Sequence, residues 1–155
     1  MTLESDAIPA AAADGAITYS GLIEKSFYTK QLTGETGVPG PGVSGVYYNN
    51  IADKDGKVIG QAYGLSVEQL PRPEDGHLTA SYHEVVTMPA GTLVGYAVVD
   101  YIAMVKGGWV QFPVKGLTGE LAGKTGYRRW KLIGPPTDFT VEVEMALWDE
   151  PGAES

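Results

Sequence analysis

An arginine and a tryptophan share one face of a predicted strand within the stretch from Gly123 to Gly134. Successive side chains of an extended strand point to opposite sides, so Arg128, Trp130 and Leu132 lie together. The other face carries Tyr127, Arg129, Lys131 and Ile133. The first face is therefore a candidate wall of a cavity that holds one indole and one guanidinium.

Two motifs, a phosphate-binding loop and a nucleophile elbow, are each incomplete. The stretch from Thr118 to Thr125 nearly matches a phosphate-binding loop, but Thr118 stands at the position of the first glycine. A strand follows this stretch, whereas phosphate binding needs the N-terminus of a helix. The residues around Ser44 lack the spacing of a nucleophile elbow. We therefore expect neither a phosphate loop nor a serine nucleophile.

Histidines and carboxylates also give no predicted metal or acid–base centre. His83 and Glu84 are adjacent in a strand and so point to opposite faces. His77 is the other histidine of the chain, and two histidines make a histidine-based metal centre unexpected. Glu142 and Glu144 share the polar face of an amphipathic strand, for which a solvated exterior is the simplest interpretation. No metal site is expected.

Aromatic residues recur over five predicted strands, at Tyr47 or Tyr48, Tyr82, Tyr101, Phe112 and Trp130. One interpretation is an ordinary core. The other is a ligand site, because buried tyrosine hydroxyls and an arginine are costly unless they form hydrogen bonds. Periodicity alone leaves both open.

Composition excludes several classes of protein. A chain of 155 residues suggests one domain, and the absence of cysteine excludes disulfides and thiolate chemistry. The net charge of −8 argues against nucleic acid or an anionic membrane surface as a partner. The longest apolar run, from Leu93 to Val105, is too short for a membrane helix. With no recognisable secretory signal at the N-terminus, we expect a cytoplasmic protein.

The 21 glycines and 10 prolines favour short strands joined by tight turns. We expect a flexible arm over 1–20, a single domain over 21–148 and a flexible tail over 149–155. Alternating patterns predict eight strands within 21–32, 46–52, 58–70, 77–88, 92–105, 109–114, 123–134 and 137–148.

Two segments leave more specific expectations. The breaker-rich loop from Thr33 to Gly45 is either a connector or a flap at the mouth of a site. The last strand has the plainest alternation, with Val141 and Val143 on one face and Glu142 and Glu144 on the other. Eight strands with no helical pattern between them favour an all-β, antiparallel up-and-down barrel with an interior ligand cavity, because closure of the sheet removes its unpaired edges. A sandwich is the alternative.

Four short motifs resemble the spirotetronate cyclases, a family of natural Diels–Alderases. They are the Thr-Gly-Tyr-Arg-Arg-Trp-Lys-Leu-Ile-Gly run ending at Gly134, Tyr82–Gly91, Trp109–Pro113 and Gly45–Tyr48. The resemblance extends from about Val43 to Leu147.

The resemblance implies an eight-stranded barrel like that of allene oxide cyclases, a hydrophobic lumen, a homodimer and no cofactor. The implied activity is an intramolecular [4+2] cycloaddition in antibiotic biosynthesis. A linear polyketide that carries a diene and an exocyclic methylene would close into a spirotetronate or spirotetramate. Such a reaction needs no nucleophile, acid–base pair or metal, which agrees with the failed motifs.

The resemblance also suggests residue roles. Tyr82 and Trp130 are the expected catalytic residues, the first as a hydrogen-bond donor and the second as the largest wall. The expected substrate-binding residues are Tyr47, Phe112, Arg128 and Leu132 from the resemblance, together with Tyr101 from the aromatic residues described above. Phe112 stands where a family member has tyrosine and Leu132 where it has methionine, so substrate shape is expected to differ.

Two other functions fit the same pattern. A lipocalin-like binding protein would return its small-molecule ligand unchanged. An isomerase like the allene oxide cyclases would act on a fatty-acid epoxide.

Overall fold

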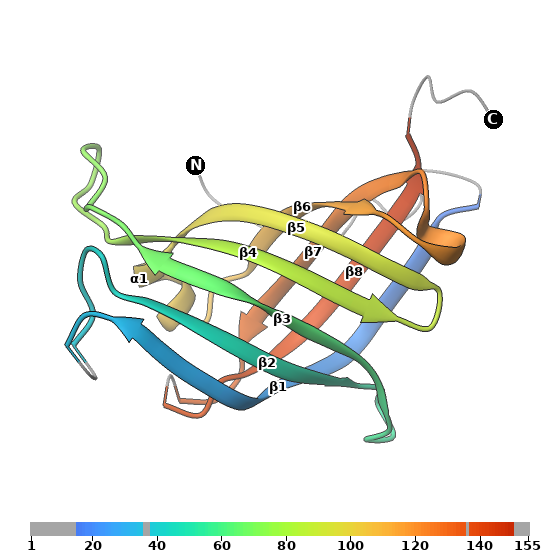
Figure 1. The fold of residues 1–155 in the computed structure, drawn as a ribbon, viewed down its shortest axis with the longest axis horizontal. Coiled ribbons are helices and arrows are strands. Elements are labelled where there is room, and N and C mark those ends of the chain that lie inside the picture. The colour runs from blue at the N-terminus through green and yellow to red at the C-terminus, as the bar shows by residue number, and fades with distance from the viewer. Residues whose placement is uncertain (1–14, 36–37, 136, 151–155) are drawn as a thin grey trace.

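Eight antiparallel strands wind into a closed barrel in the computed structural model, which describes residues 15–35, 38–135 and 137–150. Figure 1 shows them in chain order around the barrel. Their bounds are β1 Ile17–Thr33, β2 Ser44–Ala52, β3 Val58–Glu68, β4 Thr79–Met88, β5 Gly91–Asp100, β6 Val110–Gly116, β7 Lys124–Leu132 and β8 Thr140–Asp149.

Each strand pairs with its neighbour in the chain, and β1 pairs with β8 to complete the circle. The predicted all-β, eight-stranded up-and-down barrel is therefore confirmed, and the alternative of a sandwich is wrong. Closure pairs both edges of the sheet, so every strand has two hydrogen-bonded neighbours.

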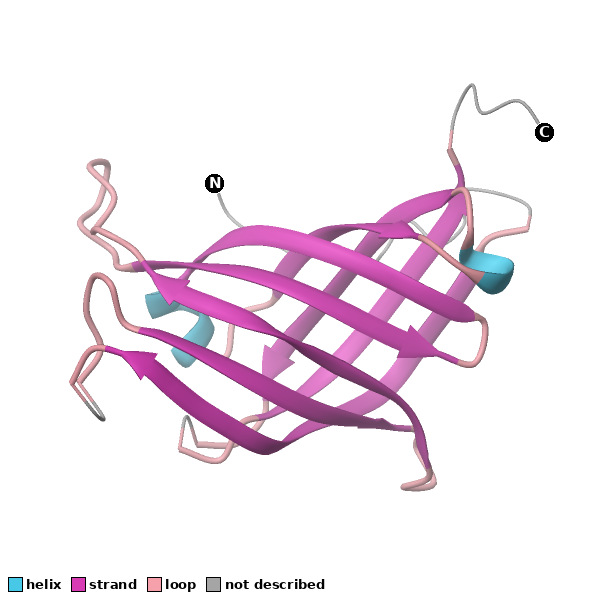
Figure 2. Ribbon diagram, in the orientation of Figure 1, coloured by secondary structure: helices cyan, strands magenta, loops and turns pink. Residues whose placement is uncertain are grey.

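Two short helical segments lie at opposite ends of the barrel (Figure 2). A 3-10 helix, Gly119–Leu121, places Leu121 in one end, where Leu93 and Leu147 are also fully buried. Helix α1, Tyr101–Val105, lies at the other end of the barrel, the end that also carries the β1–β2 and β3–β4 loops (Figure 1). The first end is packed with apolar side chains, and the second contains the cavity described below.

Strand β1 begins at Ile17, four residues before the expected domain boundary. The pairing of β1 with β8 shifts register between Tyr19 and Leu22, next to Gly21 with its positive φ of 66°. This bulge turns Leu22 and Glu24 into the barrel. The residues of the expected arm up to 14 and those of the tail from 151 lie outside the described residues.

The predicted strand over Thr92–Val105 is wrong in its second part. Strand β5 ends at Asp100, and α1 follows. The Asp100 carboxylate accepts a hydrogen bond from the Ala103 backbone N–H at 3.1 Å, which caps the helix. The apolar run therefore bends over the end of the barrel instead of continuing along its wall.

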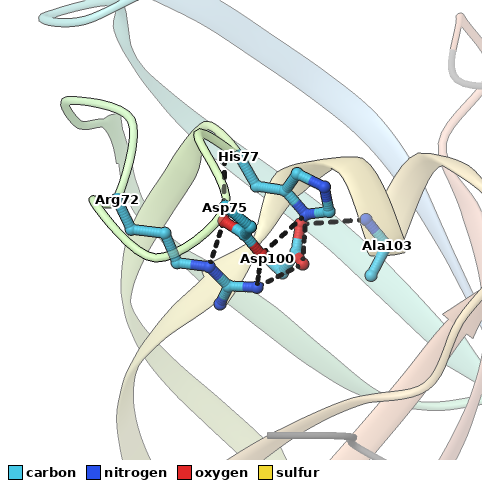
Figure 3. Close-up of polar contacts among 5 residues, drawn as sticks. All are labelled: Arg72, Asp75, His77, Asp100 and Ala103. Atoms are coloured by element: carbon cyan, nitrogen blue, oxygen red, sulfur yellow. Dashed lines mark hydrogen bonds and ion pairs between the residues drawn. The ribbon is translucent and has the colours of Figure 1, made fainter.

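A network of charged side chains holds this capping carboxylate in place (Figure 3). Arg72 donates to Asp100 at 2.9 Å and forms two hydrogen bonds with Asp75. His77 Nδ1 lies 2.9 Å from the same Asp100 oxygen. Arg72 lowers the pKa of the Asp75 carboxyl. The network ties the β3–β4 loop to the start of α1.

The outer face of β7 and β8 carries paired charges. Arg129 lies against Glu144 at 2.6 Å, and Lys131 lies 3.7 Å from Glu142. Val141 and Val143 face inwards and are fully buried. The predicted alternation of β8 is confirmed, and its two glutamates belong to the exterior. Within the described residues, no helix is long and apolar enough to cross a membrane.

Candidate active site

A cavity of about 310 Å³ occupies the end of the barrel near α1. Its size falls at the lower end of the range typical of small-molecule sites. Five strands contribute to its wall, together with Phe139 just before β8. The lining residues used below are Glu24 and Ser26 from β1, Tyr47 and Asn49 from β2, Glu68 from β3, Tyr82 and Glu84 from β4, and Arg128 and Trp130 from β7.

Trp130 is the centre of an aromatic wall. Its indole is 1% exposed and meets Tyr82 and Phe139 edge to face, with ring centroids 6.0 and 5.5 Å apart. The Nε1–H of Trp130 is buried and has no hydrogen-bond partner among the described residues. Edge-to-face packing from several sides fixes the orientation of the indole. The wall is therefore rigid, and the indole N–H is enclosed within it.

The Tyr82 hydroxyl is the second polar group of the aromatic wall. It donates to the Met104 sulfur at 3.5 Å, and a thioether is a weak acceptor. Burial raises the pKa of Tyr82, so its hydroxyl stays protonated at neutral pH. A carbonyl oxygen in the cavity would be a better acceptor than this sulfur.

Arg128 lies between two carboxylates in the floor of the cavity. Its Nε donates to Glu84 Oε2 in a short contact, and its Nη2 donates to Glu24 Oε2 at 3.1 Å. All three side chains are 1–2% exposed. Burial opposes the charge on Arg128, but Glu24 and Glu84 outweigh it and raise the pKa of the guanidinium. Arg128 therefore stays charged, and the two carboxylates hold it in place.

The Tyr47 hydroxyl donates to Glu84 Oε1 at 2.7 Å, although β3 lies between their strands. The register aligns Tyr47, Gly64 and Glu84 in one row across the wall. A Cβ at Gly64 would lie 2.9 Å from the Tyr47 hydroxyl and would clash with the His83 carbonyl. Glycine at this position therefore lets the hydroxyl reach across β3.

Asn49 and Ser26 orient the second carboxylate. Ser26 Oγ donates to Asn49 Oδ1, and Asn49 Nδ2 donates to Glu24 Oε2, each at 2.6 Å. Because the serine hydroxyl donates to the amide oxygen of Asn49, the amide nitrogen is oriented towards Glu24. The floor of the cavity is thus an ordered polar network beneath an aromatic wall.

The structure brings four of the seven predicted site residues together in the cavity lining: Tyr47, Tyr82, Arg128 and Trp130. Phe112 lies behind this wall, 5.7 Å from the Tyr82 ring and 6.0 Å from Trp130. Leu132 is part of the surrounding core, and Tyr101 packs against that core from α1. These three residues support the wall and are absent from the lining.

Glu24 and Glu84 were not predicted from the sequence. The signal for Glu84 was present, because it lies two residues from Tyr82 and so shares its inward face. Glu24 had no comparable signal, because the bulge in β1 decides which residues of that strand point inwards. The expectation that His83 and Glu84 face opposite ways is confirmed, since His83 is exposed and stacks on Tyr96 outside the barrel.

Asp75, His77 and Asp100 form a group whose ligand atoms lie within 4.8 Å of one another. Arg72 already binds both carboxylates of this group (Figure 3). Anchoring of α1 therefore explains why these charged residues lie together, and the network is not part of the cavity lining.

The chain belongs to the allene oxide cyclase barrel like domain family, whose model matches residues 28–145. The allene oxide cyclase-like barrel implied by the motifs is thereby confirmed. Among curated proteins, the sequence comparison finds no significant match.

The solved structures similar to this chain include two Diels–Alderases and one cyclase. AbnU, described as an exo-specific intermolecular Diels–Alderase, shares 25% identity, with a TM-score of 0.76 over 85% of this chain and 96% of that chain. The Diels–Alderase AbmU from Streptomyces koyangensis shares 26% identity, with a TM-score of 0.78 over 90% of this chain and 68% of that one. A third structure is described as a nonspecific heme-binding cyclase that catalyses a [4+2] cycloaddition during neoabyssomicin biosynthesis. It shares the fold at 24% identity, with a TM-score of 0.80 over 96% of this chain and 74% of that chain.

Proposed function

We propose that this protein catalyses a [4+2] cycloaddition of a linear polyketide. The observation that carries the proposal is its similarity to two Diels–Alderases of the same fold, at 25 and 26% identity over most of the chain. The cavity supports the proposal, because it combines a rigid aromatic wall with hydrogen-bond donors and lies inside a closed barrel.

The proposed substrate carries a diene and an exocyclic methylene on a tetronate or tetramate ring. Cyclisation would join the two ends and produce a spirotetronate or spirotetramate. Holding a flexible chain in the reactive geometry lowers the barrier by up to about 7–11 kcal/mol in favourable intramolecular reactions. Trp130 would provide most of this restriction, since it is the largest fully buried side chain in the lining.

Tyr82 would add an electrostatic contribution. Its protonated hydroxyl would donate to a ring carbonyl and draw electron density from the dienophile. The contact with Met104 would be exchanged for this stronger hydrogen bond. The proposed reaction conserves the mass of the substrate and requires no cofactor.

The proposal also covers the pathway, the compartment and the oligomeric state of the protein. We expect the protein to act in antibiotic biosynthesis, in the cytoplasm and as a homodimer.

The test is incubation of the purified protein with a linear tetronate polyene, followed by chromatography and mass spectrometry. We expect a new product of unchanged mass that is absent with heat-denatured protein. Recovery of bound but unchanged polyene would instead support a lipocalin-like binding protein. Conversion of a fatty-acid epoxide, with the polyene left intact, would support an isomerase like the allene oxide cyclases.

A further inference from the structure

Two polar atoms in the floor of the cavity have no hydrogen-bond partner among the described residues. They are Glu24 Oε1 and Arg128 Nη1. The two atoms form an ion pair at 2.9 Å that lacks the alignment of a hydrogen bond, and both side chains are 1% exposed. Unsatisfied buried polar atoms are rare in native proteins, and both of these residues line the cavity.

The charges in the floor do not balance when both glutamates are ionised. Glu24 and Glu84 then carry two negative charges against the single positive charge of Arg128. A net buried charge is costly, and a carboxyl group relieves the cost by taking up a proton. One of the two carboxyl groups, Glu24 or Glu84, is therefore expected to be protonated.

Hydrogen bonds indicate which carboxyl holds this proton. Both oxygens of Glu84 accept hydrogen bonds, one from Arg128 and one from Tyr47, as suits an ionised carboxylate. Glu24 accepts from Arg128 and Asn49 through Oε2 alone. Its Oε1 is left as the atom that can hold a proton.

We propose that protonated Glu24 Oε1 and Arg128 Nη1 form a two-donor site that binds one carbonyl oxygen of the substrate. Two donors separated by 2.9 Å can converge on a single acceptor oxygen. Asn49 and Ser26 hold the carboxyl in this orientation. The site favours an acceptor such as a conjugated ketone. Its identification with a tetronate or tetramate carbonyl rests on the proposed function.

The electrostatic environment supports a protonated Glu24 at neutral pH. Burial raises the pKa of its carboxyl above the ordinary value of 4.5, with Arg128 opposing the shift and Glu84 adding to it. The titratable and charged groups around it are Glu84 and Tyr82 from β4, Arg128 from β7, Tyr47 from β2, and Lys30 and Glu68 at the mouth.

Infrared spectroscopy of the resting protein at neutral pH tests the protonation without any turnover. We expect the carbonyl band of a protonated carboxyl in the wild type and its loss in Glu24→Gln. Glu68→Gln is the matched control, because Glu68 also lines the cavity, its Oε1 is likewise buried without a hydrogen-bond partner among the described residues, and burial raises its pKa as well. It should retain the band, which assigns the band to Glu24 and not to Glu68. Absence of the band from the wild type, or its loss in Glu84→Gln but not in Glu24→Gln, overturns the proposal.

A bound tetronate with a ¹³C-labelled ring carbonyl tests the contact itself. We expect the carbonyl band to shift to lower frequency on binding to the wild type and to shift less with Glu24→Leu or Arg128→Met. Equal shifts in the wild type and in a folded Glu24→Leu protein overturn the two-donor site. A protein that shows both infrared signatures but forms no cyclised product contradicts the proposed function and still supports this site.

Kinetics give a third measurement where cyclisation is observed. Loss of one such donor lowers kcat by about 10²-fold in comparable sites, and we expect this for Glu24→Leu. The donor is the protonated form, so the wild-type kcat should fall as the pH rises through the pKa of Glu24. Glu24→Gln keeps an N–H donor that does not titrate and should remove this decline. An identical decline in Glu24→Gln counts against the proposal.

Discussion

At the scale of single residues, Trp130 and Tyr82 carry different parts of the proposed reaction. Trp130 restricts the shape of the substrate through its fixed indole, whereas Tyr82 offers a hydroxyl whose present acceptor is a weak one. The two roles are separable, because one depends on volume and the other on a single oxygen atom.

Replacement of Trp130 by alanine should slow the cyclisation of a linear tetronate polyene by at least about tenfold, because the substrate would no longer be held in a reactive shape. Loss of a buried tryptophan also costs about 3–5 kcal/mol of stability, so circular dichroism must show that the variant is folded. Trp109→Phe is the control, since Trp109 lies outside the lining, under Arg129 and Lys131. Wild-type turnover by a folded Trp130→Ala protein would contradict the role of this wall.

Tyr82→Phe removes one oxygen atom and preserves the aromatic packing. We expect a lower kcat with little change in KM, because the hydrogen bond to the carbonyl strengthens as charge develops in the transition state. Steady-state kinetics with the polyene measure both constants. An unchanged kcat would remove the hydroxyl from the mechanism.

At the scale of elements, the wall depends on how closely neighbouring strands approach. Gly64 of β3 lies between Tyr47 and Glu84, and its missing side chain permits their hydrogen bond. The β1–β2 loop lies at the same end of the barrel as the cavity, where Val43 of the loop and the adjoining Gly45 of β2 contribute to the lining.

Gly64→Ala should destabilise the protein by about 1–3 kcal/mol, because the added methyl group is forced against the backbone and the Tyr47 hydroxyl. Urea unfolding monitored by fluorescence measures this loss. Gly40→Ala serves as the control, since a Cβ at Gly40 meets no atom within 4 Å. Equal stability of the two variants would show that the close approach at Gly64 is unimportant.

Shortening the β1–β2 loop tests whether it gates the cavity. Backbone hydrogen bonds of 2.8 Å tie Gly42 and Val43 to Glu68, so deletion of Val38 to Pro41 leaves this anchor in the chain. If the loop is a flap, product release or product selectivity should change, as measured by burst-phase kinetics and product analysis. Unaltered kinetics would make the loop a connector.

At the scale of the whole molecule, one outer surface of the barrel is rich in exposed aromatic residues. Tyr28, Tyr48 and Tyr63 face each other across β1, β2 and β3, and Tyr96 lies farther along on β5. Each of these rings is 38–48% exposed. Contiguous exposed apolar surface often marks an interface.

The expected homodimer should give twice the 16.4 kDa mass of one chain in light scattering after size exclusion. If the dimer uses the aromatic surface, Tyr48→Lys should raise the dissociation constant at least about tenfold, since a buried lysine is costly. Val58→Lys, at an exposed position near the β2–β3 turn, is the control. A monomeric wild type would contradict the dimer, and an unaffected Tyr48→Lys dimer would contradict this surface.

The sequence by itself determined the eight strands and the inward face of β7, and it favoured a barrel over a sandwich. Alternation with a period of two places Arg128 and Trp130 together on one face, and eight such strands joined by short turns favour closure. The same alternation in β8 separates its valines from its glutamates, and both predictions agree with the structure.

Only the tertiary structure decided what Arg128 meets. Its partners Glu84 and Glu24 lie 44 and 104 residues away in the chain, and a strand pattern contains no information on such pairs. A bulge beside Gly21 turns Glu24 inwards, and the Asp100 cap ends β5 early and bends Tyr101 away from the wall. Local periodicity follows from the backbone, whereas bulges, caps and the meeting of distant side chains depend on closure of the barrel.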